Sequence, residues 1–211
     1  MYLTTRIFAG IAMVTLAGAA VVATGPAADA ATQACGSGCV ALAPGEFGTA
    51  DVASITGLVL QARHATIASA GQHDPEDFTP KHLGMVWILF KEGIVNNVVA
   101  RGWPGMLATE YQYTPDGNST GLCLGVPETP AAGTVVSLYP CGVTSRTIWI
   151  GMAADEHDDY EPMINAAQTN LSSPYVLTAG AVGAPLTTAE LSETGNVPAA
   201  AQTWQDEFGV L

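Results

Sequence analysis

Two segments in the second half of the chain align with each other, and this internal repeat constrains the fold more than any other feature. In each segment a short apolar strand is followed by a Gly-containing turn, a second strand and a closing tryptophan. Leu124 precedes Trp149 by almost the same interval as Leu177 precedes Trp204. Repeats that cannot bury their apolar faces alone are expected to close around one shared core. The spacing therefore predicts equivalent buried positions for the two tryptophans, each with an acceptor for its indole N–H.

The rest of the sequence has the composition of short strands joined by turns. Charged residues make up only 12% of the chain, which contains 23 glycines and 13 prolines. This composition favours an all-β sandwich or barrel over a helical bundle. The expected strands cover residues 58–62, 65–68, 107–113, 122–126, 135–139, 147–152, 175–178 and 185–191.

Residues 79–105 differ in character, because they carry helix signals. Thr79 is a good N-cap, Pro80 suits the first helical position, and Gly93 suits a left-handed helix end. Apolar residues recur at helical spacing; they are Leu83, Val86, Trp87, Phe90 and Ile94. Residues 85–90 also fit a buried strand, since six apolar residues in a row carry no period. The start and stop signals favour a helix.

The residues around the two tryptophans resemble the ricin-B-type β-trefoil family, whose repeats open on a Cys-Leu strand and close on Gln-x-Trp. The Leu-Tyr-Pro-Cys run at 138–141 matches the Leu-aromatic-Pro-Cys of that family, and Gln202 with Trp204 matches its closing motif. The resemblance is clear over 107–211 and faint over 51–78, where the first repeat would have to lie. It implies that Trp149, Gln202 and Trp204 are structural core residues.

The resemblance implies an all-β fold, a β-trefoil domain over 51–211. The helical stretch at about 79–105 is then an insertion between the first and second repeats. Residues 31–50 are expected to form an irregular N-terminal segment before the domain.

The four cysteines are expected to form two disulfides in an exported protein. Of the three connectivities, proximity in the sequence favours Cys35–Cys39 and Cys123–Cys141. The spacing of the second pair also suits the disulfide that the resembled family forms within a repeat. A loop of this length is expected to contribute about 3 kcal/mol to stability.

Only part of the sugar-binding pattern of the resembled family is present. In the lectins of that family an Asp follows the Cys-Leu strand, an aromatic ring stacks on the sugar, and amide side chains bind its hydroxyls. In the central repeat Gly125 replaces the Asp, Ser137 stands where a Gln is common, and residues 146–147 replace the polar pair before the tryptophan. Tyr139 keeps the aromatic position, and Glu128 offers a displaced carboxylate. The candidate carbohydrate-binding residues are therefore Tyr139, Ser137 and Glu128.

The resemblance implies a non-catalytic, lectin-like protein with weak or degenerate carbohydrate binding, directed at extracellular or cell-wall glycans. The alternative is a protein-binding or inhibitor-type β-trefoil that uses its loops or the helical insertion. No Gly-x-Ser-x-Gly motif occurs, and the histidines do not follow metal-ligand spacing; they are His64, His73, His82 and His157. We expect no enzyme activity, no cofactor and no metal site.

The first thirty residues are typical of a signal peptide. Arg6 precedes an apolar stretch at 7–24, and residues 28–30 offer a small-x-small cleavage pattern. A membrane anchor is the alternative, but glycine and alanine dilute the stretch. We expect a secreted, extracellular protein. Its net charge of −13 makes nucleic acid a poor partner, and an anionic membrane a poor partner after cleavage.

Overall fold

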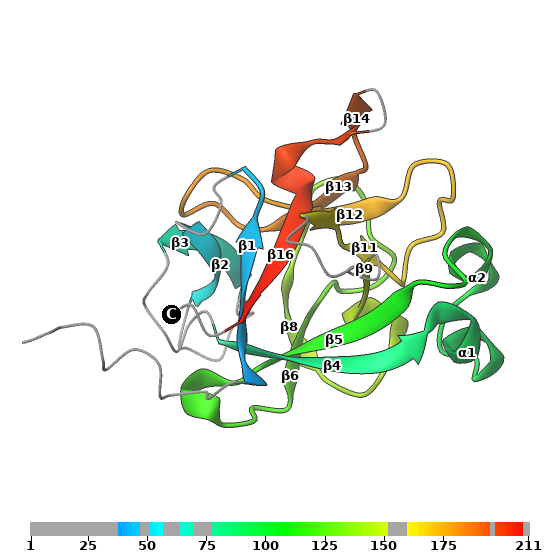
Figure 1. Cartoon of the computed structure of the whole chain (residues 1–211), viewed down its shortest axis with the longest axis horizontal. Coiled ribbons are helices and arrows are strands. Elements are labelled where there is room, and N and C mark those ends of the chain that lie inside the picture. The colour runs from blue at the N-terminus through cyan, green and yellow to red at the C-terminus, as the bar shows by residue number, and fades with distance from the viewer. Residues whose placement is uncertain are drawn as a thin grey trace, which may run out of the picture.

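The computed structural model describes residues 38–46, 51–56, 64–69, 77–151, 160–194 and 197–208. The expected signal peptide, Cys35, the expected strand at 58–62 and two histidines, His73 and His157, lie outside these residues. The described residues form an all-β fold that carries two short helices at one end (Figure 1). None of the described helices has the length and apolarity needed to cross a membrane.

Six strand positions form a closed antiparallel barrel. In order around the barrel they are β1 (Val40–Pro44), β4 (Phe78–Met85), β5 (Leu107–Tyr113), β9 (Ile148–Gly151), the pair β11 (Ile164–Asn165) and β10 (Glu161–Pro162), and β16 (Thr203–Phe208). β11 pairs with β9, and β10 pairs with β16, which in turn pairs with β1. Because β10 and β11 are almost continuous in the chain, they close the ring.

Three hairpins, one from each repeat, meet around a common axis. They are β2 (Asp51–Thr56) with β3 (His64–Ser69), β6 (Leu122–Gly125) with β8 (Ser137–Pro140), and β12 (Tyr175–Thr178) with β13 (Thr187–Glu190). The short β7 (Thr134–Val135) pairs with β13, and β14 (Glu193–Thr194) pairs with β15 (Val197–Pro198).

A ring of three backbone hydrogen bonds joins the hairpins at this axis. Ala65 N–H donates to the Val136 carbonyl (3.1 Å), Val136 N–H to the Leu186 carbonyl (2.9 Å), and Leu186 N–H to the Ala65 carbonyl (2.7 Å). All three residues are fully buried. A cyclic set of equivalent bonds places the three hairpins in equivalent positions, so the fold has the pseudo-threefold symmetry of a β-trefoil.

The same symmetry relates the closing aromatic residues. The Trp149 indole donates to the Leu124 carbonyl, and the Trp204 indole donates to the Leu177 carbonyl, both at 2.9 Å. Phe78 takes the equivalent position in the first repeat. In all three repeats the carbonyl of the residue before the aromatic accepts a backbone N–H. The donor is Thr114 for Asp77 (2.9 Å), Ala166 for Ile148 (3.0 Å) and Gly45 for Thr203 (2.9 Å).

The main core is built from equivalent residues of the three repeats. Its buried members include five triplets, which are Leu42/Tyr111/Met163, Ala53/Leu124/Leu177, Ile55/Val126/Ala179, Ala65/Val136/Leu186 and Phe78/Trp149/Trp204. The first repeat supplies Ala53 and Phe78 where the other repeats have leucine and tryptophan. These smaller residues explain why its sequence resembles the other repeats only faintly.

The first repeat begins earlier than the sequence predicts. β1 lies within the segment expected to be irregular, at 31–50, and pairs with β16 along its whole length. All five of its residues are buried. Val40 and Leu42 pack into the main core, whereas Ala41 and Ala43 pack into a separate small cluster. A strand that is buried on both faces shows no alternation of polar and apolar residues, which is why its sequence did not indicate a strand.

The helical insertion exists, but the sequence predicts its start wrongly. Thr79 and Pro80 belong to β4, which pairs with β5 as far as Met85. Among the described strands β4 pairs with β1 only at Phe78, so the Pro80 backbone on that side has no strand partner, and proline is tolerated there. The helices are α1 (Val86–Lys91) and α2 (Asn97–Gly102).

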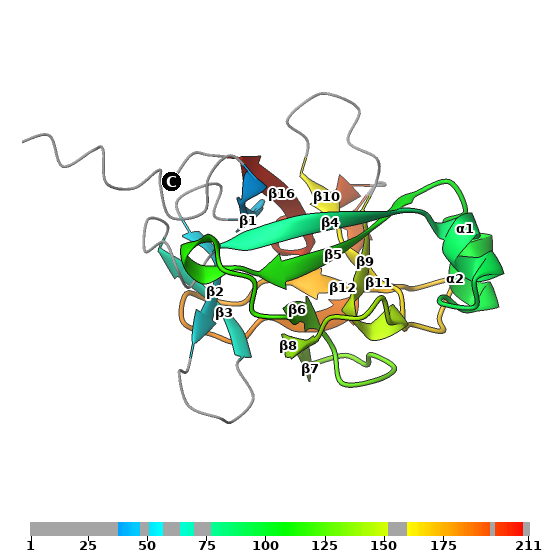
Figure 2. The same cartoon turned by 90° about the horizontal axis from the view of Figure 1, so that it is seen from below.

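Local signals explain where these helices begin and end. Asn96 is the N-cap of α2, because its side-chain oxygen accepts the N–H groups of Val98 (2.9 Å) and Val99 (3.0 Å). Gly93 follows α1 with a φ of 75°, as its left-handed position predicts. We call residues 81–106 the helical arm; both views show its two helices side by side at one end of the molecule (Figures 1 and 2). It separates the first repeat from the second.

Candidate functional site

The central repeat carries the disulfide that anchors the candidate site. Cys123 on β6 is bonded to Cys141, which follows β8, and their Cα atoms are 5.0 Å apart. Cys123 is also the cross-strand neighbour of Tyr139. The disulfide therefore ties the strand that carries Tyr139 to its neighbour. For the other predicted pair, Cys39 is buried beside Thr79 and Thr114, and its expected partner Cys35 lies outside the described residues.

Tyr139 and Arg146 form one stacked pair on this repeat. The Arg146 guanidinium carbon lies 4.7 Å from the centre of the Tyr139 ring. The Arg146 Nη1 donates to the Pro127 carbonyl at 3.3 Å. Both side chains are partly exposed. Partial burial raises the pKa of the Tyr139 hydroxyl, and the positive charge of Arg146 opposes that rise. The ring and the guanidinium thus present a combined apolar and cationic surface.

The backbone of Arg146 is held from two sides. Its carbonyl accepts the Val126 N–H at 3.1 Å and the side-chain amide of Asn165 at 3.2 Å. Val126 follows β6, whereas Asn165 ends β11 in the next repeat. These bonds fix the backbone from which the side chain extends, and the guanidinium itself is held over the Tyr139 ring by its bond to the Pro127 carbonyl.

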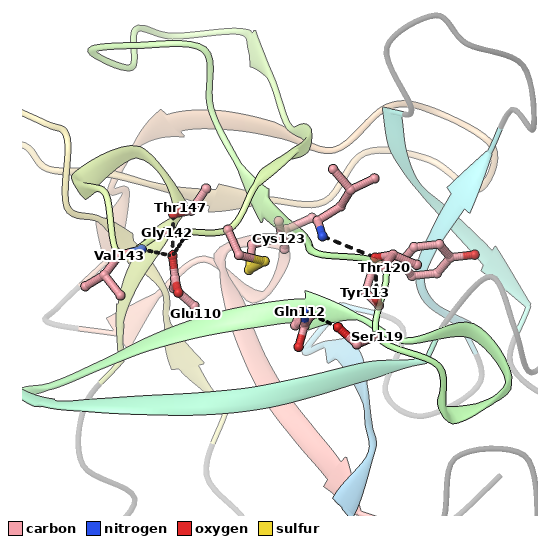
Figure 3. The surroundings of a disulfide bond; sticks show 12 residues. Glu110, Gln112, Tyr113, Ser119, Thr120, Cys123, Gly142, Val143 and Thr147 are labelled. Carbon is pink, nitrogen blue, oxygen red and sulfur yellow. Dashed lines mark hydrogen bonds between the residues drawn. A yellow bond between two sulfur atoms is a disulfide. The ribbon is translucent and has the colours of Figure 1, made fainter.

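A buried carboxylate holds the connection between β8 and β9 from beneath (Figure 3). Glu110 on β5 is fully buried, and its Oε1 accepts the Val143 N–H (2.9 Å), the Gly142 N–H (3.4 Å) and the Thr147 hydroxyl (2.7 Å). Val143 has a φ of 54°, which is unusual for a β-branched residue. Strain of this kind persists only where surrounding contacts impose it, and it gathers at functional sites. Glu110 supplies those contacts directly below the loop that ends in Arg146.

Sequence reasoning did not identify Glu110 as part of the site. In the run Leu-Ala-Thr-Glu-Tyr-Gln-Tyr, alternation places Glu110 on the same face as Gln112, opposite Tyr111 and Tyr113, so the sequence indicates a polar position and gives no signal of its burial. A carboxylate at such a position requires donors that the strand itself does not provide.

The three predicted carbohydrate-binding residues differ in exposure. Tyr139 is partly exposed and Glu128 is exposed on the loop after β6. Ser137 is 3% exposed, so its hydroxyl is not available at the surface. Gly125 is enclosed as well, because a Cβ atom there would lie 2.7 Å from the Arg146 carbonyl oxygen. The packing around Gly125 leaves no room for the aspartate that the resembled family has at this position.

The predicted core residues are buried, and Gln202 has a defined bonding role. Its side-chain oxygen accepts the Ser192 N–H at 2.7 Å, and its amide donates to the Glu190 carbonyl at 2.9 Å. By the repeat symmetry Thr147 is its counterpart in the central repeat, and it bonds to Glu110 instead.

The Tyr139–Arg146 pair has no counterpart in the C-terminal repeat. The strand pairing places Ala189 opposite Val176 as it places Tyr139 opposite Cys123. Ala201 corresponds to Arg146, since its carbonyl accepts the Ala179 N–H at 2.8 Å as the Arg146 carbonyl accepts Val126. In the first repeat Ala68 takes the place of the tyrosine. The described part of the chain also contains no cluster of three or more His, Cys, Asp or Glu residues able to hold a metal ion.

Comparisons with known proteins bear on the fold. Neither the protein-family models nor the curated proteins contain a match to this sequence. Among solved structures, the designed threefold-symmetric protein ThreeFoil is similar with a TM-score of 0.52 at 13% identity, over 81% of this chain and 98% of that chain. The β-trefoil lectin of Vibrio vulnificus hemolysin/cytolysin, solved with N-acetyl-D-lactosamine bound, gives a TM-score of 0.48 at 11% identity, over 82% and 96% of the two chains.

The class of this protein follows from its own symmetry together with the likeness to ThreeFoil. It is a β-trefoil with a helical insertion between its first and second repeats. At 13% identity the likeness shows the fold alone.

Proposed function

We propose that this protein is a secreted, non-catalytic binding β-trefoil that contacts an acidic saccharide through Tyr139 and Arg146. The observation that carries this proposal is the guanidinium held 4.7 Å over the tyrosine ring. The guanidinium covers one face of the Tyr139 ring, so the C–H face of a sugar is expected to pack against the other face. A guanidinium forms bidentate hydrogen bonds with a carboxylate. Together they match a sugar ring that carries a carboxylate, such as a uronic acid.

The chemistry of the site favours an acidic sugar over a neutral one. A site for neutral sugars uses a carboxylate to accept hydroxyl groups, and the enclosure of Gly125 leaves no room for that carboxylate. The group over the ring is a cation, and the predicted carboxylate, Glu128, is exposed on the loop after β6. The site therefore offers donors to an anion. One contact of this kind, on a chain of net charge −13, supports weak binding.

Binding to polygalacturonate and to neutral dextran tests the proposal. The wild-type protein is expected to be retained by polygalacturonate and to show background retention on dextran. Tyr139→Ala and Arg146→Gln are each expected to reduce retention at least fivefold, because one removes the stacking surface and the other removes the cation.

Tyr175→Ala is the matched control, since Tyr175 is a partly exposed tyrosine on β12 of another repeat. It is expected to bind as wild type does. Background retention of the wild type on the acidic polymer, or equal retention of all variants, would refute the acidic-saccharide proposal. Equal retention on both polymers would refute the role given to Arg146.

A further inference from the structure

The two helices of the arm carry apolar residues on both faces. Their inner faces form a second core against the outside of the barrel, with Val86, Leu89, Val95 and Val99 buried against β9, β11 and β12. The outer face of α1 and the residue before it are exposed. Met85 is 48% exposed, Trp87 41% and Phe90 43%. The second core is complete without these three side chains, so the need to bury a core does not explain them.

A cation of the arm itself lies over the exposed tryptophan. The Lys91 ammonium lies 4.4 Å from the centre of the Trp87 ring. The Trp87 indole N–H donates to the Met85 sulfur at 3.3 Å, which is a weak acceptor. The patch formed by Met85, Trp87 and Phe90, which we call the aromatic patch, is therefore bordered by a positive charge.

The arm differs in charge from the rest of the protein. Residues 81–106 contain three of the six basic residues, Lys81, Lys91 and Arg101, and one of the nineteen acidic residues, Glu92. The arm thus carries a net charge of +2, while the remainder of the chain carries −15. All three basic side chains are exposed. A negatively charged surface would attract the positive arm and repel the negative remainder of the chain.

We propose that the helical arm docks on the surface of an anionic phospholipid bilayer. Met85, Trp87 and Phe90 enter the boundary between headgroups and acyl chains, where tryptophan is favoured, and the three cations meet lipid phosphates. The whole-chain charge of −13 predicts repulsion from such a surface. The negative charge, however, belongs to the rest of the chain, which we call the body, and the arm itself is positive. Repulsion of the body and attraction of the arm together orient the molecule with its helices toward the lipid.

The size of the aromatic patch favours lipid over a protein partner. Each of its three side chains is between two-fifths and one-half exposed, so the accessible area of the patch is on the order of 300 Å². A stable protein–protein interface buries about 800 Å² on each partner. Peripheral attachment to a bilayer needs only a few inserted side chains together with basic residues. This docking is separate from the saccharide contact, because it uses no residue of the central-repeat site.

Sedimentation with vesicles tests the docking proposal. Protein recovered from the culture medium of a secreting host is mixed with vesicles of phosphatidylcholine alone, or of two parts phosphatidylcholine to one part phosphatidylglycerol. Binding to the anionic vesicles is expected to be at least tenfold stronger, and added salt at molar concentration is expected to abolish it. Equal binding to both vesicles, or none to either, would overturn the proposal.

Matched variants separate the contributions of the patch and the charge. Trp87→Ala combined with Phe90→Ala is expected to abolish vesicle binding, and Arg101→Gln to weaken it about fivefold. Val182→Ala removes an exposed apolar side chain outside the arm and is expected to bind as wild type does.

Two further measurements distinguish loss of vesicle binding from misfolding and from self-association. Circular dichroism establishes that each variant is folded, and Arg101→Gln, an exposed substitution, provides the test if the double variant does not fold. Size-exclusion chromatography with light scattering tests the alternative occupant, a second copy of the chain. Self-association that the arm variants abolish, without any lipid binding, would assign the aromatic patch to a protein contact and overturn the lipid proposal.

Discussion

Among single residues, Asp206 is placed where its charge is costly. It lies on β16, and the Tyr111 hydroxyl from β5 donates to both of its carboxylate oxygens, at 3.2 and 3.1 Å. Burial raises the pKa of Asp206 to about 6, although the Tyr111 hydrogen bond and the nearby His82 both act to lower it. Burial also raises the pKa of Tyr111 well above its usual value. The barrel thus contains a carboxyl group whose pKa, at about 6, lies well above that of an exposed aspartate.

This position predicts a distinctive pH dependence of stability. The folded chain holds the Asp206 proton more tightly than the unfolded chain does, so this contribution is fully present at pH values below the usual aspartate pKa. It is lost as the pH rises through about 6, and the free energy of unfolding is expected to fall by ~3 kcal/mol between pH 3.5 and pH 7. Asp206→Asn is expected to remove that fall. Denaturant unfolding of both proteins across this range measures it, and parallel curves would contradict the assignment.

The sequence indicated some site residues and not others, for reasons visible at single positions. Tyr139 was predicted because the Leu-aromatic-Pro-Cys run fixes its place on the strand. Ser137 lies on the same strand, but its burial depends on contacts from other strands that a local motif does not contain. Glu110 is far in sequence from the Gly142 and Val143 amides that it binds, so no spacing rule connects them.

At the scale of elements, the connection between β8 and β9 is held by contacts at three points. The disulfide fixes its start, Glu110 binds its middle, and the Arg146 carbonyl is bonded at its end. Because the guanidinium of the candidate site extends from this connection, the rigidity of the element determines the geometry of the site.

Glu110→Gln tests the contribution of the carboxylate to this element. The substitution keeps the shape of the side chain but replaces charge-assisted hydrogen bonds with neutral ones, which is expected to cost about 1–3 kcal/mol. Hydrogen exchange at the amides of Gly142 and Val143 is expected to accelerate, because these groups donate to the carboxylate. Glu190→Gln, at an exposed position, is the control. Unchanged exchange at both amides would show that the loop does not depend on Glu110.

The helical arm shows where local signals become ambiguous. Thr79-Pro80 fits the start of a helix, yet it also fits an edge strand that continues a hairpin. The pairing with β5, which the sequence does not reveal locally, favours the strand. The predicted apolar face was right in part: Val86 is buried and Leu83 and Ile94 pack against the second core, whereas Trp87 and Phe90 are exposed. The left-handed Gly93 was predictable, since one residue determines it.

For the whole molecule, the sequence repeat made the second and third repeats predictable but not the first. Strand 107–113 and strand 175–178 match their predicted bounds, because turns and alternating residues delimit them. The first repeat lacks both the tryptophan and the paired cysteines of the central repeat. Its equivalence with the others becomes visible in the structure, above all in the ring of hydrogen bonds among Ala65, Val136 and Leu186. Backbone bonds of this kind leave no trace in side-chain identity.

Pseudo-threefold symmetry also predicts equal energetic roles for the two tryptophans. Trp149→Phe and Trp204→Phe each remove an indole donor and leave a buried leucine carbonyl without its hydrogen bond. Each is expected to lower the free energy of unfolding by about 2–4 kcal/mol, from the lost bond and the lost volume. Because the surroundings are equivalent, the two costs are expected to agree within ~1 kcal/mol. Trp87→Phe, at an exposed position, is expected to cost less than ~0.5 kcal/mol. Denaturant unfolding measures all three, and a large cost at only one of the two buried positions would show that the repeats do not share the core equally.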